Sequence, residues 1–325
     1  MVVSSIDDLF GLFYDISFPE ENRDRNLLHN GKRALVHYTS AETGAKIIKS
    51  KKLWLRNARN TNDKSEIIYS LSKFEISFKK YSDSYEKLFY EIDRVSGPQK
   101  FANFARGYFL NIIDQSFISC FSNHPAGDLK LQDFGKLSMW RAYGSANAVC
   151  IVLNAKNIFD TNIELLRAPL IKIRYDGEYF FNNELERFLF ELNKNISLLK
   201  SDPELAFDLI AYKMQIDVLS VKHPSFKEEE EYRIVFSPSA PSEIVKNPHV
   251  ETINGLPELF YSVPLDLVGN DESCDLRIEK VIKKIVIGPS NAQEQLRASF
   301  EHLLRESGVS NAETRVQIAD VPLRV

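Results

Sequence analysis

The chain has 325 residues, of which 44% are hydrophobic and 26% are charged, and its formal net charge is −4. This composition excludes a wholly disordered chain and supplies enough apolar side chains for a packed core, in one large domain or two ordinary ones. The net charge argues against a generally basic nucleic-acid-binding surface, although a local basic groove stays compatible with it.

Three cysteines, Cys120, Cys150 and Cys274, are widely spaced and form no CxxC pair. They make a poor disulfide framework and a poor zinc site, which favours a reducing compartment, and we expect Cys120 and Cys150 to be small buried hydrophobes. The N-terminus is acidic and lacks the basic region of a secretory signal, and no apolar run approaches the roughly 18 residues of a membrane span. We therefore expect a cytoplasmic protein with no membrane partner.

The first third of the chain alternates between helical and extended patterns. Apolar residues at helical spacing predict a leading helix within residues 1–30, and Ala34–Tyr38 has the pattern of a short strand. Ser40 is placed to cap the helix that follows, and Leu53–Leu55 is extended. A polar loop over 56–63 leads to two amphipathic helices, 64–95 and 99–115, which Gly97–Pro98 separates.

The rest of the chain contains the remaining strands. Ser116–Ser122 is strand-like, and Ala148–Leu153 is nearly continuously apolar, as in a strand covered on both faces. Further strands are expected at 168–175, 231–236, 258–264 and 280–287, and helices at 182–200, 203–220 and 291–307. We therefore predict a single α+β domain over 1–325, with a mixed, short-stranded sheet and helical insertions at 64–115 and 182–220.

An acidic run precedes the strand Tyr232–Phe236. Strand alternation would put Glu229 and Glu231 on one face, followed by Arg233. Two such carboxylates can take different roles, and a neighbouring guanidinium would keep one of them ionised. The alternative is a solvated acidic turn that leads into an edge strand, which is what charge runs usually form.

The segment His37–Tyr38–Thr39–Ser40 is a second candidate site. A histidine at a strand end can bind a sugar hydroxyl or transfer a proton, and the hydroxyl-rich helix start can hold a phosphate. A lone histidine is more often structural, however. Trp140, Arg141 and Tyr143 form a third candidate, since such groups can stack on a flat ring and hold a charge at its edge, although they can equally form a corner of the core.

Other chemistries are not indicated by the motifs. GxGxxG, GxxxxGK[ST], HExxH and GxSxG are absent, and the six histidines lack the spacing of metal ligands. A polar loop over 57–63 with Glu66 can cover a ligand or be plain surface. A metal-dependent nuclease that uses Glu229, Glu231 and Lys222 stays open as an alternative.

The order of these motifs resembles an uncharacterised family of prokaryotic proteins, some of which are associated with antiphage defence. The shared elements cover roughly residues 33–290, and Phe226 departs from the family, whose members more often carry Trp there. They run in the order His37–Tyr38–Thr39, Asn62–Asp63–x–x–Glu66, Ile118–Ser122, Met139–Trp140–Arg141–x–Tyr143 and Lys222–x–x–x–Phe226–x–x–Glu229–x–Glu231–Tyr232–Arg233.

The arrangement is also similar to that of ADP-ribosyltransferases. This resemblance implies that His37, with Tyr38 and Thr39, orients NAD, and that Glu231 is the catalytic carboxylate, with Glu229 positioning the acceptor. It implies a fold like that of these enzymes, with no metal, since a carboxylate can stabilise the oxocarbenium-like transition state. The pocket for nicotinamide and pyrophosphate would be lined by Ser119, Trp140, Arg141, Tyr143 and Arg233.

The resemblances together predict a toxin or defence effector that consumes NAD as a substrate. Its acceptor would be a macromolecule, either RNA, DNA or protein, and a cognate antitoxin would be a further partner. The helical insertions are large enough to recognise an acceptor, and Lys73, Lys79 and Lys80 can meet phosphates or form a solvated helix face. NAD hydrolysis without an acceptor, a metal-dependent nuclease and a non-catalytic nucleotide-binding sensor stay open.

Overall fold

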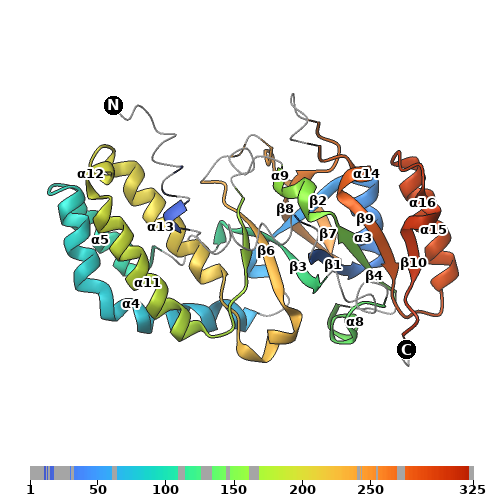
Figure 1. The fold of residues 1–325 in the computed structure, drawn as a ribbon, viewed down its shortest axis with the longest axis horizontal. Helices are drawn as coiled ribbons and strands as arrows, with labels where there is room; N and C mark the ends of the chain where they lie inside the picture. Colours follow the sequence, from blue (N-terminus) through green and yellow to red (C-terminus); the bar gives the residue numbers. More distant parts are fainter. Residues whose placement is uncertain are drawn as a thin grey trace. The chain divides into compact units, whose positions relative to one another are not determined.

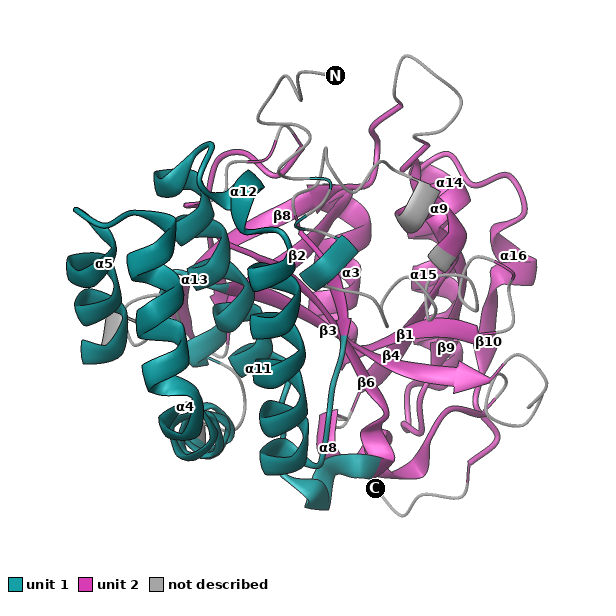
Figure 2. Ribbon diagram, turned by 60° about the vertical axis from the view of Figure 1, so that its left-hand side comes forward, with its two compact units in different colours: residues 1–22, 58–116, 172–227 teal, residues 23–57, 117–171, 228–325 magenta. Residues whose placement is uncertain are grey.

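The structure is a computed structural model that describes residues 11, 13, 15–17, 30, 33–60, 64–108, 114–125, 134–143, 147–160, 168–239, 242, 244–253, 255–268 and 275–321. Contacts divide the chain into two compact units, each assembled from three segments (Figure 2). Unit 1 comprises residues 1–22, 58–116 and 172–227, and unit 2 comprises residues 23–57, 117–171 and 228–325. Both predicted helical insertions fall in unit 1, and the single-domain assignment stays a prediction.

Unit 1 is helical in its described part. The long helix α4 (Lys64–Ile92) packs against α11 (Gly177–Lys194) and α13 (Pro203–Leu219), as Figure 1 shows. The predicted break at Gly97–Pro98 is confirmed, because these residues begin α5 (Gly97–Asn103). A Cβ atom at residue 97 would lie 2.1 Å from the Phe89 carbonyl oxygen, so only glycine fits this crossing. The shorter elements are η1 (Ala58–Asn60), the π-helical η2 (Phe104–Tyr108) and α12 (Ile196–Leu199).

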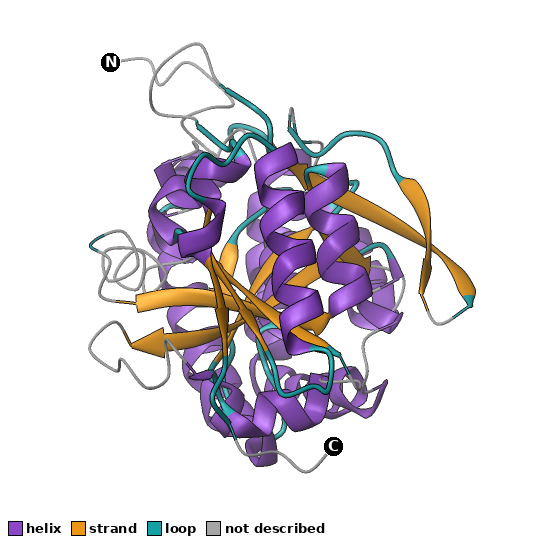
Figure 3. Ribbon diagram, turned by 90° about the vertical axis from the view of Figure 1, so that its right-hand side faces the viewer, coloured by secondary structure: helices purple, strands orange, loops and turns teal. Residues whose placement is uncertain are grey.

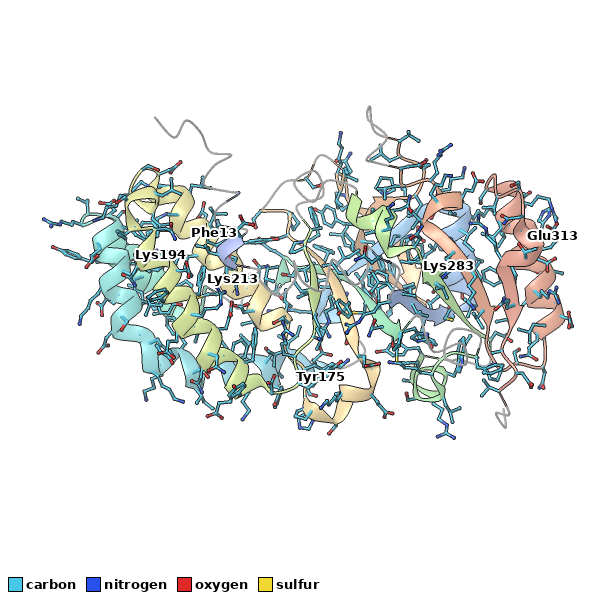
Figure 4. All side chains as sticks on the ribbon, in the orientation of Figure 1. Phe13, Tyr175, Lys194, Lys213, Lys283 and Glu313 are labelled. Atoms are coloured by element: carbon cyan, nitrogen blue, oxygen red, sulfur yellow. The ribbon has the colours of Figure 1, made fainter. Side chains whose placement is uncertain are left out.

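A buried cluster of charges joins two helices of unit 1. Lys213 of α13 is 1% exposed, pairs with Asp217 one turn later and donates to Glu184 of α11 over 2.8 Å. Arg187 also binds Glu184, through two contacts of 2.9 and 2.5 Å. Burial alone would lower the pKa of Lys213, but Asp217 and Glu184 raise it above its usual value. Lys213 is therefore an interior cation neutralised by its neighbours (Figure 4).

Unit 2 is organised around the mixed, open sheet. The described strands have the order β10-β9-β4-β1-β3-β2-β8-β7, with β6 on the other edge of β3 and β5 beside β6. β9 and β10 are parallel, whereas the other pairs with a known register are antiparallel, and β9 lies between β4 and β10 (Figure 1). The strands are β1 (Arg33–Ser40), β2 (Lys52–Asn57), β3 (Phe117–Pro125), β4 (Ala148–Leu153), β5 (Leu170–Lys172), β6 (Glu231–Phe236), β7 (His249–Ile253), β8 (Leu256–Pro264), β9 (Ile282–Ile287) and β10 (Val316–Ile318).

Two apolar layers cover the two faces of this sheet. On one face Leu35 and Ile151 pack with Ile47 of α3 (Ala41–Ser50) and Phe300 of α15 (Gln293–Glu306). We call this side the α3 face. On the other face Val36, Tyr38 and Cys150 pack with Met139 and Trp140 of α8 (Leu137–Tyr143), which defines the α8 face. Figure 3 shows helices flanking the strands. The apolar run of β4 is thus explained, because this strand is covered on both faces.

Most of the predicted elements of unit 2 are confirmed. β4 and β6 have the predicted bounds, and Ser40 caps α3 by accepting from the Thr43 amide over 3.1 Å. β7, β10, α8, α9 (Ala155–Asp160), α14 (Ile278–Val281) and α16 (Ala312–Arg315) were not predicted. The leading helix falls mostly outside the described residues, within which Phe13 and Ile16 are helical and buried. No helix in the described residues has the length and apolarity needed to cross a membrane.

The expectation for the cysteines is met only in part. Cys150 is buried, and its burial raises the pKa of the thiol to about 12, which makes it an inert core residue. Cys120 is half-buried rather than buried. Cys274 lies outside the described residues.

Candidate functional site

Glu231 and Arg233 form an ion pair at the start of β6. β6 pairs with β3 so that Glu231 lies opposite Ser122 and Arg233 opposite Cys120. Directly paired residues point to the same face, and Ser122 also pairs with Val36, so both charged side chains lie on the α8 face. Arg233 Nε donates to Glu231 Oε1 over 2.6 Å, and the residues are 2% and 3% exposed. The predicted shared face of Glu231 and Arg233 is confirmed.

Glu229 does not belong to this strand, so its predicted alternation with Glu231 is wrong. It ends the short helix η3 (Pro224–Glu229), and Glu230 follows with φ 46°, in the left-handed region. A strand that begins only at Glu231 cannot carry Glu229 at an alternate position. Glu229 is buried all the same, and its carbonyl accepts from Ser122 Oγ over 2.6 Å. The alternative interpretation, a solvated acidic turn, is therefore wrong for Glu229, because this residue is buried.

Tyr38, His124 and Lys136 form a hydrogen-bonded set on the α8 face. The Tyr38 hydroxyl accepts from the Lys136 amide over 2.7 Å and lies 3.1 Å from His124 Nε2. The hydroxyl keeps its own proton and a second lone pair, so the tautomer of His124 decides which of the two groups donates in this contact. Burial raises the pKa of Tyr38 well above its usual value, so the phenol stays protonated. Tyr38 therefore keeps its proton while it accepts from the Lys136 amide.

Helix α8 contacts Tyr38 of this set through the Trp140 ring. The Trp140 ring is perpendicular to that of Tyr38 at 4.9 Å, and its Nε1 donates to Phe134 O over 2.7 Å. Gly135 and Gly288 make room for the indole, because a Cβ atom at either position would lie 2.8 Å from it. Arg141 is exposed and Tyr143 is half-buried against the core of the α8 face.

The α3 face carries a different group of predicted residues. β3 pairs with β1 from Ser122 onward and with β2 at Phe117 and Ile118, so Ser119–Phe121 lie between these two ladders. At this fork His37 Nδ1 donates to the Cys120 carbonyl over 2.9 Å, so neutral His37 presents Nε2 as an acceptor. Burial lowers the pKa of His37, although this hydrogen bond opposes the effect. The Ser119 hydroxyl is buried without a hydrogen-bond partner.

The register therefore separates the predicted site into two groups. The α8 face carries Tyr38, Trp140, Glu231 and Arg233, with Arg141 and Tyr143 on the same helix as Trp140. His37, Thr39 and Ser119 lie on the α3 face, because they pair with Ile151, Val149 and Ile234 of its core. The functional roles of all these residues stay predictions.

Lys222, which the nuclease alternative requires, has a partner within unit 1. Its ammonium lies 3.4 Å from Glu66 Oε2 and 4.7 Å from the centre of the Phe226 ring. Lys222 and Glu66 are 4% and 5% exposed, so Glu66 belongs to the interior rather than to a surface loop. Across the described part of the chain, no group of three or more His, Cys, Asp and Glu side chains is arranged to hold a metal ion.

Residues 139–234 match a protein family described as "Protein of unknown function (DUF2971)". The matched segment runs from α8 to β6, so it contains both Trp140 and the Glu231–Arg233 pair. Similarity to an uncharacterised family is thereby confirmed, over a shorter stretch than the 33–290 expected. No curated protein and no solved structure matches the chain.

Ser122, His124 and Lys136 belong to the polar set of the α8 face but were not predicted. A signal for two of them existed, because Cys120, Ser122 and His124 alternate along one strand and must share a face. Lys136 had no such signal, since it precedes α8 in a stretch without periodicity. Its place depends on contacts with residues about 90 positions later in the chain, at separations of 92–94.

Proposed function

We propose that this chain is an NAD-consuming ADP-ribosyltransferase in which Glu231 is the catalytic carboxylate. The observation that carries the proposal is the buried Glu231–Arg233 ion pair on the α8 face. When the bond between nicotinamide and ribose breaks, its electron pair leaves with nicotinamide and the ribose becomes oxocarbenium-like. A carboxylate fixed in a poorly solvated place stabilises that cation strongly. The acceptor then bonds to ribose C1 and releases its proton.

Other residues of the α8 face and of helix α8 have the groups that this reaction needs. Tyr38 is a hydroxyl held protonated, and Tyr143 is a half-buried aromatic ring for stacking on nicotinamide. The exposed guanidinium of Arg141 suits the pyrophosphate. Because His37 lies on the α3 face, the proposal gives it no contact with the ribose that Glu231 binds.

The direct test is incubation of the protein with adenylate-labelled NAD and cell extract. We expect nicotinamide release and transfer of the label to a macromolecule. Sensitivity of the labelled product to nuclease or to protease identifies a nucleic-acid or a protein acceptor, and free ADP-ribose identifies hydrolysis. Absence of both nicotinamide release and transfer overturns the proposal.

Two glutamates in the same sheet allow a matched comparison. Glu258 binds Arg56 through contacts of 2.8 and 2.7 Å, so Glu258→Gln also removes a carboxylate from an arginine pair. We expect Glu231→Gln to lower kcat/KM by at least about 100-fold and Glu258→Gln to leave it near wild type. Equal losses of kcat/KM in the two variants would indicate that Glu231→Gln disturbs the sheet and does not remove a catalytic group.

A double variant separates catalysis from folding. Glu231→Leu with Arg233→Met removes both charges, and replacing a buried ion pair by apolar side chains is often neutral for stability. We expect this variant to fold and to lack activity. A folded double variant with wild-type activity would exclude Glu231 as the catalytic group.

The prokaryotic family that the chain resembles extends the proposal to a toxin or defence effector with a cognate antitoxin. Expression of the wild type should then arrest growth, and the double variant should not. Activity that is lost on chelation and needs no NAD would support the nuclease alternative. An unchanged cellular effect of the folded double variant would support a nucleotide-binding sensor.

A further inference from the structure

The turn that leads into β6 is held in an unfavourable conformation. Glu230 has φ 46°, in the left-handed region, where the Cβ atom of an L-residue comes too close to the following carbonyl oxygen. Such a conformation persists only where its surroundings fix it. Glu231 is the next residue, so the turn sets where β6 starts and which face receives the carboxylate.

Lys136 makes three contacts with this turn. Its ammonium donates to Glu230 Oε2 over 2.6 Å, and to the carbonyl oxygens of Glu228 and Glu229 over 3.2 and 3.5 Å. The Lys136 side chain is 10% exposed, so the three oxygens replace most of its hydration. β3 adds two contacts, because Ser122 Oγ donates to the Glu229 carbonyl over 2.6 Å and the Asn123 amide donates to the Glu230 carbonyl over 3.0 Å.

The same lysine is tied to β1. Its backbone amide donates to the Tyr38 hydroxyl over 2.7 Å, while its side chain reaches the turn before Glu231. One residue therefore connects Tyr38 of β1 with the turn before β6. Of the residues that Lys136 contacts, Tyr38 and Glu229 are buried, whereas Glu228 and Glu230 are exposed.

We propose that Lys136 is a positioning residue that sets the carboxylate of Glu231 by holding the Glu228–Glu230 turn. This inference rests on the proposed function of Glu231. A displacement of about 1 Å at a reacting group can cost about 100-fold in rate, so loss of Lys136 acts on the chemical step. The lysine itself touches no substrate.

The test compares Lys136→Met with Lys46→Met. Lys46 is a suitable control because its ammonium also contacts one carboxylate and one carbonyl oxygen in unit 2, those of Glu42 at 2.9 Å and Thr252 at 3.2 Å. Lys136→Met should lower kcat by roughly 10-fold or more with KM for NAD changed less than about 3-fold. Lys136→Arg should recover much of kcat, since a guanidinium can donate to the same oxygens, and Lys46→Met should match wild type.

A second variant, Glu230→Gln, and a measurement of hydrogen exchange complete the test. Glu230→Gln removes only the carboxylate and should lower kcat less than Lys136→Met does. Hydrogen exchange at the Asn123 amide reports the turn without reference to activity, and it should be faster in Lys136→Met. Wild-type kcat in a folded Lys136→Met chain overturns the proposal, as does unchanged exchange. If wild type releases no nicotinamide, the proposed function fails, and the exchange result still decides whether Lys136 holds the turn.

Discussion

His37 shows how one hydrogen bond determines what a side chain can do. The Cys120 carbonyl can only accept, so the Nδ1 proton is fixed and Nε2 is left as an acceptor at the fork between β1 and β2. Burial lowers the pKa of the ring, so His37 is neutral in the folded protein at pH 7. It is therefore suited to accept a hydrogen bond rather than to hold an anion.

The lowered pKa of His37 predicts a stability that depends on pH. Below the ordinary histidine value of 6.5 the unfolded chain takes up a proton that folded His37 resists. The contribution of His37 is thus complete above pH 6.5 and is lost as the pH falls through its folded pKa. His37→Gln should lose less free energy of unfolding than wild type between about pH 7.5 and 5.5, measured in urea. If wild type and His37→Gln lose the same free energy of unfolding over this pH range, the lowered pKa of His37 is contradicted.

The Glu231–Arg233 pair predicts unequal costs for single and double changes. Glu231→Gln leaves a buried guanidinium with a weaker partner, and breaking a buried pair this way costs roughly 3–5 kcal/mol. The double change Glu231→Leu/Arg233→Met should cost much less, because it removes both charges of the pair. Urea unfolding checks the order, and a double variant less stable than Glu231→Gln would contradict it.

At the level of elements, the packing of α8 depends on Gly135 and Gly288, which leave room for the Trp140 indole. Gly288→Ala would put a Cβ atom 2.8 Å from the indole and 3.0 Å from the Ala148 oxygen, and such overpacking costs about 1–3 kcal/mol. The chain has two tryptophans, so emission in a Trp54→Phe background reports Trp140 alone. We expect Gly288→Ala to shift this emission. An unchanged spectrum would mean that the backbone gives way instead.

Elements with strong local patterns were predictable from the sequence, and elements without them were not. β4 and β6 were found because their apolar runs are marked, and α3 because Ser40 caps it. β7 was missed although the dipeptide Asn254–Gly255, a common hairpin turn, follows it; its side chains are half-exposed or exposed, which weakens the alternation. β10 has only three residues and depends on its parallel pairing with β9.

The site was predictable to the extent that it depends on alternation. Arg233 two residues after Glu231 indicated their shared face, and the structure agrees. The left-handed Glu230 ended the alternation at Glu229, and no pattern in the sequence announces that turn. The opposite faces of His37 and Glu231 follow from the register of β1, β3 and β6, which depends on contacts between distant parts of the chain.

At the level of the whole chain, the two units carry different spectroscopic probes. Trp54 and Trp140 both belong to unit 2, whereas the long helices α4, α11 and α13 belong to unit 1. Lys213→Met removes a buried cation from two carboxylates and should cost unit 1 roughly 3–5 kcal/mol. The circular dichroism transition should then move to lower denaturant than the fluorescence transition. Coincident transitions in this variant would show that the units unfold together.

The position of β9 has a consequence for how the chain is made. β4 ends at Leu153 and has β1 on one edge, but the strand that covers its other edge begins only at Ile282. At a ribosomal rate of about 5–20 residues per second, the second neighbour is on the order of 10 s away. During that interval the nascent polypeptide exposes an apolar strand edge, the kind of segment that aggregates when unprotected. We therefore expect the yield of folded protein to rise when chaperones shield extended apolar segments until β9 has emerged.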